Sequence, residues 1–236
     1  WNNATQQFAV AWQPFKSVAH KKLMEAIVFF ALILVVAVKA FTINTVEEIL
    51  EMRNVPRHMI SSPSMEITVP AIEAMRYSPL RREIAALIAS SMDRENADLA
   101  HPSFLSILQQ LTEDEVRILA AVPSEGRVLP VAHLWVNLNN DHAEIIHRNI
   151  VPRSVANLCN NKSRVPLYID NLIRLKLLHE PEGAKIANAR VYSNLLRQEF
   201  CARILEKPGV RKHSTLEKRT IALTSIGDAF RRACLA

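Results

Sequence analysis

Residues 78–119 contain the pattern that most constrains the fold, because three helix signals follow one another there with only short polar breaks between them. A capping oxygen followed by proline predicts the start of the first helix, at residues 78–79. Pro102 predicts the start of the second helix. Thr112 and Glu115 predict a capping box at the start of the third, where acidic side chains also stabilise the positive end of the helix dipole. The sequence therefore predicts a block of short helices in the middle of the chain.

The polar break before the second helix contains an unusual word, His101-Pro102-Ser103-Phe104. We expect Phe104 to be buried on the apolar side of that helix. A histidine close to a serine suggests a base and a nucleophile, but adjacency in sequence does not bring the two groups into contact, and Pro102-Ser103 is more simply a helix start. We expect Asp93 to end the preceding helix and His101 to cap the next, which makes a hydrogen-bonded corner.

These words resemble the Abi-alpha family, bacterial proteins of unknown biochemical activity that are linked by name to abortive infection. The resemblance extends from Asn54 to the C-terminus. It implies a role in phage defence that depends on binding a protein partner, and it supplies no catalytic residues. The words that resemble the family are residues 63–77, 80–82, 87–93, 101–104 and 109–115, and a C-terminal word that contains Leu223, Thr224, Gly227, Phe230 and Cys234.

The composition predicts a mainly α fold without enzymatic chemistry. Only 4 Gly and 6% aromatic residues argue against an all-β sandwich, while helix-favouring residues dominate. The 3 Cys are far apart, which favours buried thiols in a reducing, cytoplasmic compartment over a disulfide framework or a zinc site. The chain has no Gly-rich phosphate loop and no hydrolase or metalloprotease motif, and the spacing of His133, His142 and His147 does not suit a metal. We therefore expect no enzymatic activity, no metal and no cofactor.

We divide the chain into three parts. Residues 1–53 form an N-terminal helical region, residues 54–122 a central helical domain that resembles Abi-alpha, and residues 123–236 a linker followed by a small winged-helix-like α+β unit. The last part rests on a helix predicted over residues 166–178, a short strand over 220–223 and a final helix capped by Thr224. In the winged-helix interpretation, residues 170–178 are the recognition-type helix. A further strand is predicted over residues 128–136.

Residues 26–46 form an apolar segment with two interpretations. Residues 26–38 contain no charged or polar side chain, and Lys39 is the only charge up to residue 46. The first interpretation is a helix that packs on all sides, within the domain or in a homo-oligomer. The second is a helix inserted in a membrane, where Lys21 and Lys22 would form the cytoplasmic flank. The resemblance implies a more charged, amphipathic helix here, so this segment departs from the family pattern. Because the segment is so apolar, membrane association is the alternative function.

A third function follows from the charge, which is +6 overall and concentrated late in the chain. From residue 160 onward there are 15 Lys and Arg against 7 Asp and Glu. An excess of that kind favours a polyanion such as nucleic acid, although it also suits an ordinary solvated surface. The candidate contacts are Arg174 and Lys176 on the predicted helix, and Arg211 and Lys212 in a basic loop. Because no aromatic residues alternate with these cations, a stacking surface for bases is not predicted.

Overall fold

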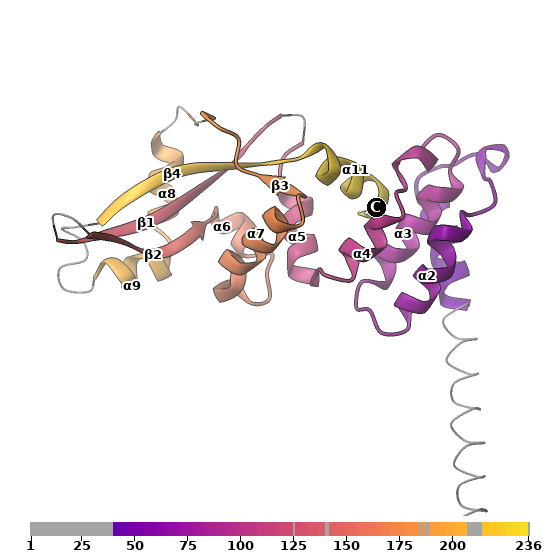
Figure 1. The fold of residues 1–236 in the computed structure, drawn as a ribbon, viewed down its shortest axis with the longest axis horizontal. Helices are drawn as coiled ribbons and strands as arrows, with labels where there is room; N and C mark the ends of the chain where they lie inside the picture. The colour runs from indigo at the N-terminus through magenta and orange to yellow at the C-terminus, as the bar shows by residue number, and fades with distance from the viewer. Residues whose placement is uncertain are drawn as a thin grey trace, which may run out of the picture.

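The computed structural model is mainly α-helical with one antiparallel sheet, as the sequence predicts (Figure 1). It describes residues 40–124, 126–139, 142–184, 186, 189–206 and 214–235. Most of the apolar segment 26–46 and both cations of the basic loop, Arg211 and Lys212, lie outside the described residues.

The first half of the described chain is helical, and its central element is α3 (Arg81–Met92). Every side chain of α3 from Ile84 to Ser91 is buried, because other helices, including one from the C-terminal end of the chain, contact it on several sides. The other described helices of this half are residues 40–52, η1 (Arg57–Met59), α2 (Met65–Met75), η2 (Ala97–Leu99), α4 (Ser103–Leu108) and α5 (Glu113–Ala121). The capping box predicted for the third helix is present at the start of α5.

The second half contains a sheet with the strand order β2-β1-β4-β3, in which all neighbours are antiparallel. Its strands are β1 (Leu129–Asn139), β2 (His142–Ile150), β3 (Leu178–His179) and β4 (Ser214–Leu223). The helices of this half are α6 (Arg153–Ala156), η3 (Lys162–Arg164), α7 (Val165–Arg174), α8 (Ala189–Leu196), α9 (Glu199–Leu205) and α11 (Ser225–Cys234).

Strand β1 is buried on both faces, because it separates two apolar cores. Leu129 and Val131 belong to the large core that continues through the helical half. Ala132 and Leu134, on the opposite face, belong to a second core that includes Tyr192 of α8. Successive side chains of a strand point to opposite faces, so this division follows from the two-residue period.

Several predicted boundaries in this half were wrong. The strand predicted over residues 220–223 is only the end of β4, and β2 was not predicted. The helix predicted over residues 166–178 starts at Val165, within one residue of the prediction, but it ends at Arg174, because Lys176 adopts a left-handed backbone (φ 60°). The N–H groups of Lys176 and Leu177 donate to the carbonyls of Ile173 and Leu172, which is the Schellman pattern of a helix end.

Helix α11 brings the C-terminal end of the chain back to α3 (Figure 1). The Ser90 hydroxyl of α3 donates to the Ala233 carbonyl at 2.7 Å, and the Arg53 guanidinium donates to Ser90 at 2.8 Å. Phe104 of α4 packs edge-on against Phe230 of α11, with 5.3 Å between the ring centroids. As predicted, Phe104 is buried. One core therefore includes residues from Val46 to Cys234, and the division at residue 122 stays a prediction.

The contact between Phe104 and Phe230 makes a test of this core. Phe104→Ala should lower the free energy of unfolding by about 3–5 kcal/mol, since it leaves a cavity and removes an aromatic pair. Urea denaturation measures the loss. Tyr77→Ala is the control, because Tyr77 is 78% exposed and should cost less than about 0.5 kcal/mol. Equal losses in the two variants would contradict the assigned packing.

Two residues of the C-terminal word, Thr224 and Gly227, join α11 to the end of α7. The Thr224 hydroxyl accepts the Gly227 N–H at 2.8 Å and donates to the Lys176 carbonyl. A Cβ on Gly227 would lie 2.0 Å from the Leu177 carbonyl oxygen, which is far closer than two such atoms approach. Glycine is required here by the close approach of two backbones.

Gly227→Ala should therefore destabilise the protein strongly, by more than about 3 kcal/mol, since backbone and not a flexible side chain would have to move. Thermal unfolding measures the effect. Ala229→Gly, two residues further along the same helix, is the control and should cost only about 1 kcal/mol through helix propensity. A Gly227→Ala variant as stable as the wild type would refute the close approach.

Candidate functional site

The described chain begins with an inverted burial pattern. Between residues 40 and 46 the buried side chains include Thr42 and Thr45, whereas Phe41 and Ile43 are 43% and 58% exposed. The Thr42 hydroxyl donates to the Met75 sulfur at 3.1 Å, so this end of the helix lies beside the end of α2. Large apolar side chains exposed on this helix, where it packs against α2, make this end a candidate interaction surface.

Tyr77, which follows α2 directly, adds an exposed aromatic ring to the same end of the helical half. We call Phe41, Ile43 and Tyr77 the N-terminal apolar end. Basic side chains lie next to it. The Arg76 guanidinium lies over the Tyr77 ring at 5.8 Å, and Arg81 donates to the Met75 carbonyl at 2.8 Å. Aromatic rings beside arginine are typical of a surface that meets either a protein or a membrane interface.

The structure bears only in part on the membrane interpretation of residues 26–46. Within the described ranges, no helix has both the length and the apolar character to cross a bilayer. Residues 26–39 lie outside those ranges, while residues 40–46 are helical and form the start of the N-terminal apolar end.

The corner between α3 and α4 is hydrogen-bonded at both of its ends. Asp93 is buried and follows α3, and its carboxylate accepts the Glu95 N–H at 3.1 Å and the Asn96 amide at 2.6 Å. At the other end, His101 Nδ1 accepts the Ser103 N–H at 3.1 Å, which satisfies one of the free N–H groups in the first turn of α4. Pro102 lies between them at the start of that turn.

The sequence argument that His101 and Ser103 do not meet was wrong, because His101 Nδ1 lies 2.7 Å from the Ser103 hydroxyl oxygen. The turn before α4 folds the ring back over the helix start, where it also contacts Phe104. Both side chains are exposed, and in the described part of the chain no carboxylate is bonded to the other ring nitrogen. The Asp93 carboxylate bonds within its own turn, so the contact of His101 with Ser103 is that of a helix cap.

The predicted nucleic-acid contacts are not gathered on one exposed helix face. The Arg174 guanidinium bonds to the Asn171 amide oxygen at 2.7 and 2.9 Å and to the Gln110 amide oxygen at 3.1 Å. It therefore joins α7 to the connection between α4 and α5. Lys176 is exposed but lies beyond the end of α7, and Arg211 and Lys212 are outside the described residues.

Sequence reasoning missed a buried acidic network that joins α5 to α7. The Asp114 carboxylate accepts the backbone N–H groups of Asn160 and Asn161 at 2.9 and 3.0 Å. It also accepts the Tyr168 hydroxyl at 3.3 Å and the Arg117 guanidinium at 2.6 Å. The sequence indicated only that acidic side chains stabilise the start of a helix. No local signal shows that Asp114 meets a loop 46 residues later.

The protonation state of Asp114 follows from these bonds. Burial by itself raises the pKa of the carboxyl, but the N–H groups of Asn161 and Asn160, the Tyr168 hydroxyl and the Arg117 charge together hold the pKa below its usual value. The pKa of the Tyr168 hydroxyl is raised, first by burial and then by the nearby negative charge of Asp114. Asp114 is therefore ionised at neutral pH, and it stabilises the fold in that form.

Asp114→Asn should lower the free energy of unfolding by about 3 kcal/mol at pH 7, because the amide cannot accept from every donor around it. Because the pKa of Asp114 is lower in the folded state, ionised Asp114 stabilises the fold fully above the unfolded pKa, about 3.9. That stabilisation is lost as the pH falls through the folded pKa. Urea unfolding at pH 7 and about pH 3 should therefore show the variant approaching the wild type in acid. Glu113→Gln, which removes an exposed partner of Arg117, is the control and should change little at either pH. A constant difference for Asp114→Asn would refute this account.

The cysteine thiols are buried, as the sequence predicts. Cys159, Cys201 and Cys234 are buried and free, and burial raises the pKa of the Cys201 thiol to about 11. His133 is buried, and its Nδ1 accepts the Asn149 N–H at 3.1 Å. Among the residues that the structure describes, no three His, Cys, Asp or Glu side chains are grouped as metal ligands.

Comparison with known proteins identifies the family. The sequence profile described as "Abortive infection alpha" matches residues 38–234. The chain belongs to this family. Abi-alpha thus covers both the helical half and the sheet half, and it includes the corner at residues 93–104 and the C-terminal word.

Other comparisons add little. No curated protein matches the chain. Among solved structures, the chain is similar to one described as the uncharacterized protein from the hydrocarbon-degrading marine bacterium Alcanivorax borkumensis SK2. The identity is 16%, the match covers 61% of this chain and 96% of that chain, and the TM-score is 0.36. A likeness this weak supports no argument about fold or function.

Proposed function

We propose that this Abi-alpha protein acts in phage defence without enzymatic chemistry, by binding a protein partner through its N-terminal apolar end. The observation that carries the proposal is the exposure of Phe41 and Ile43 beside Tyr77, while threonines of the same helix are buried. Exposing large apolar side chains to water is unfavourable, by about 25 cal/mol for each Å² of apolar surface. A partner that covers them recovers that free energy.

The His101–Ser103 contact fits this non-enzymatic proposal, because its bonds account for the start of α4. We therefore expect Ser103→Ala to keep any protective activity. Loss of activity in a stably folded Ser103→Ala variant would favour a catalytic role for the pair instead.

A membrane is the alternative partner for the same surface. Its support is continuity, since Phe41 and Ile43 directly continue the apolar run of residues 26–38 with only Lys39 as a charge. Arg76, Tyr77 and Arg81 would then lie at the level of lipid headgroups, where arginine and tyrosine are favoured. In this alternative the chain is a membrane-associated effector.

A nucleic-acid-binding winged helix is the third candidate, and the order of elements supports it. In a winged helix the first strand follows the first helix and pairs with the last strand, and a pair of helices precedes the strands of the wing. Here α5 precedes β1, the helices α6 and α7 precede β3, and β4 lies between β1 and β3. The hairpin partner β2 and the inserted α8 and α9 would be additions to that arrangement. Fold does not determine the ligand, and Arg174 is bonded within the protein.

Plaque assays on bacteria that express the protein test the first proposal. The double variant Phe41→Ser and Ile43→Ser should lose protection against a phage that the wild type restricts. Leu158→Ser with Leu167→Ser is the matched control, because these leucines are 43% and 61% exposed in the sheet half. The control should protect like the wild type. Equal protection by both double variants, at equal protein levels, would refute the role of the N-terminal apolar end.

Fractionation of the same cells separates the two partners. If a protein is bound, both double variants and the wild type should remain in the supernatant. The wild type and the Leu158→Ser/Leu167→Ser control should then co-purify with a stoichiometric partner, whereas the Phe41→Ser/Ile43→Ser variant should not. If a membrane is bound, the wild type should sediment with membranes and resist high-salt extraction. Binding of the purified protein to duplex or single-stranded probes, falling steeply with salt and weakened by Arg174→Glu with Lys176→Glu, would instead favour nucleic acid.

A further inference from the structure

A cavity of about 510 Å³ lies in the sheet half, where the end of β2 meets α6, the start of α7 and α9. Of the residues singled out in the sequence, only His147 is among the described residues that line it. Its size is within the range of small-molecule sites, about 300–1,000 Å³.

The ionisable side chains that line the cavity are basic. Arg153 of α6, Lys162 of η3 and Arg203 of α9 come from three separate elements, and His147 of β2 is the fourth. Burial lowers the pKa of His147, which keeps its ring neutral at pH 7. No Asp or Glu is among the described residues that line the cavity. Arg153 and Lys162 together, with no carboxylate among the described lining residues, favour a negatively charged ligand.

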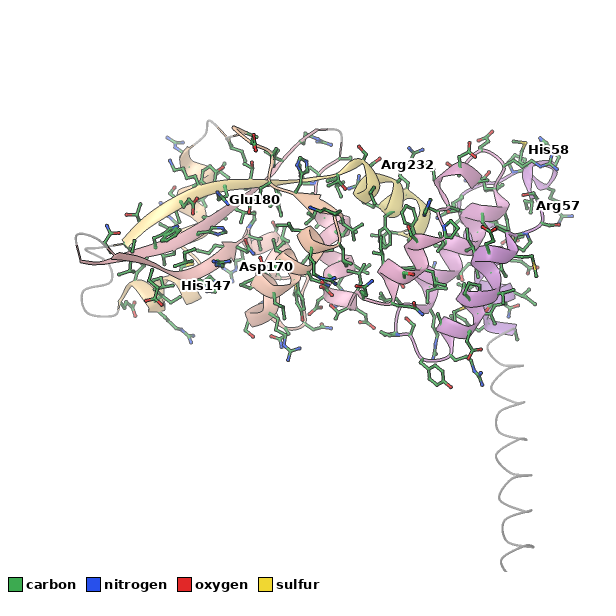
Figure 2. All side chains as sticks on the ribbon, viewed as in Figure 1. Arg57, His58, His147, Asp170, Glu180 and Arg232 are labelled. Atoms are coloured by element: carbon green, nitrogen blue, oxygen red, sulfur yellow. The ribbon has the colours of Figure 1, made fainter. Side chains whose placement is uncertain are left out.

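The cations themselves are exposed at the entrance. Lys162 donates to the Asn157 amide oxygen at 2.8 Å, while Arg153 has no acidic partner in the described part of the chain. Asp170 is the nearest carboxylate on the neighbouring helix. It accepts the Asn149 amide at 2.8 Å and does not line the cavity. Figure 2 shows His147 and Asp170 at the boundary between the sheet and α7.

Two buried amides hold the inner wall in place. Asn149, which is 3% exposed and has a left-handed backbone (φ 50°), donates from its side chain to the Pro166 carbonyl at 3.2 Å as well as to Asp170. Gln198 donates to the Val151 carbonyl at 2.8 Å, which fixes the connection between α8 and α9 to the end of β2. A wall held by buried hydrogen bonds is formed before a ligand arrives.

The rest of the lining is apolar. Ile150, Val151 and Val165 are buried around the cavity, and Ile204 of α9 is partly buried in the second core. No aromatic side chain other than the His147 ring is among the lining residues, so an apolar group would be held by aliphatic packing and not by stacking. Apolar walls with a few polar groups at one side are the usual form of a ligand site.

We propose that this cavity binds a phosphate monoester of a small apolar organic group. Arg153 and Lys162 bind the phosphate at the entrance, and Ile150, Val165 and Ile204 contact the apolar group inside. A phosphate monoester carries a charge of about −1.5 to −2 at pH 7 and offers three acceptor oxygens. It therefore matches two cations better than a ligand with a single carboxylate, which carries one charge. The inference concerns binding alone and does not depend on the N-terminal apolar end.

Isothermal titration calorimetry on the full chain tests the proposal with matched probes. Phenyl phosphate should bind about tenfold or more tightly than inorganic phosphate, phenol or benzoate, because only phenyl phosphate combines the dianion with an apolar group. Its affinity should fall when sodium chloride is raised, since exposed charges are screened. Equal affinity for phenol would refute the role of the cations, and equal affinity for inorganic phosphate would refute the apolar contact.

Variants localise the binding. Arg153→Gln with Lys162→Gln should weaken binding of phenyl phosphate about tenfold or more. Arg164→Gln, which removes an exposed cation of the same 3-10 helix that does not line the cavity, should bind like the wild type. Ser163→Trp should block the cavity while it keeps all the cations, and it should therefore abolish binding. Binding retained by folded Ser163→Trp, or lost equally in Arg164→Gln, would place the ligand elsewhere and overturn the proposal.

Discussion

The packing of α11 on α3 is the contact on which the rest of the structure depends. Helix α3 is buried along most of its length, and a helix from the far end of the chain supplies part of its cover. Burial of apolar surface is the main favourable term in folding, and a single helix face cannot supply enough of it. The helical half therefore requires Phe230 and its neighbours, although 126 residues separate Phe104 from Phe230 in the sequence.

The return of α11 also explains the geometry of the sheet half. Strand β4 leads directly into α11, and Thr224 with Gly227 joins that junction to the turn after α7. Asp114 makes a second connection, from α5 to the loop before α7. Helix α7 is thus held at both of its ends. The cavity lined by Arg153 and Lys162 lies beside its start, so Val165 and Pro166 in the wall of that cavity belong to a helix held at both ends.

The two surfaces proposed to act are different in chemistry and in place. The N-terminal apolar end is an exposed group of apolar and aromatic side chains, which suits a large partner that excludes water. The cavity is concave and basic with aliphatic walls, which suits a small anion. The two surfaces are proposed independently of each other, and the large core connects the helical half with the sheet half. The connection to abortive infection rests on membership of the Abi-alpha family.

The sequence by itself determined features that depend on neighbouring residues. The capping box at Thr112, the burial of Phe104, the mainly helical fold and the family all follow from words within one or two helical turns, because caps and amphipathic faces are local. Only the tertiary structure decided what depends on distant residues. It brought Asp114 to the loop at Asn160 and placed Arg153 and Lys162 around one cavity. Such contacts leave no local pattern, since the partner of each group is chosen by the packing of whole elements and not by its neighbours in the chain.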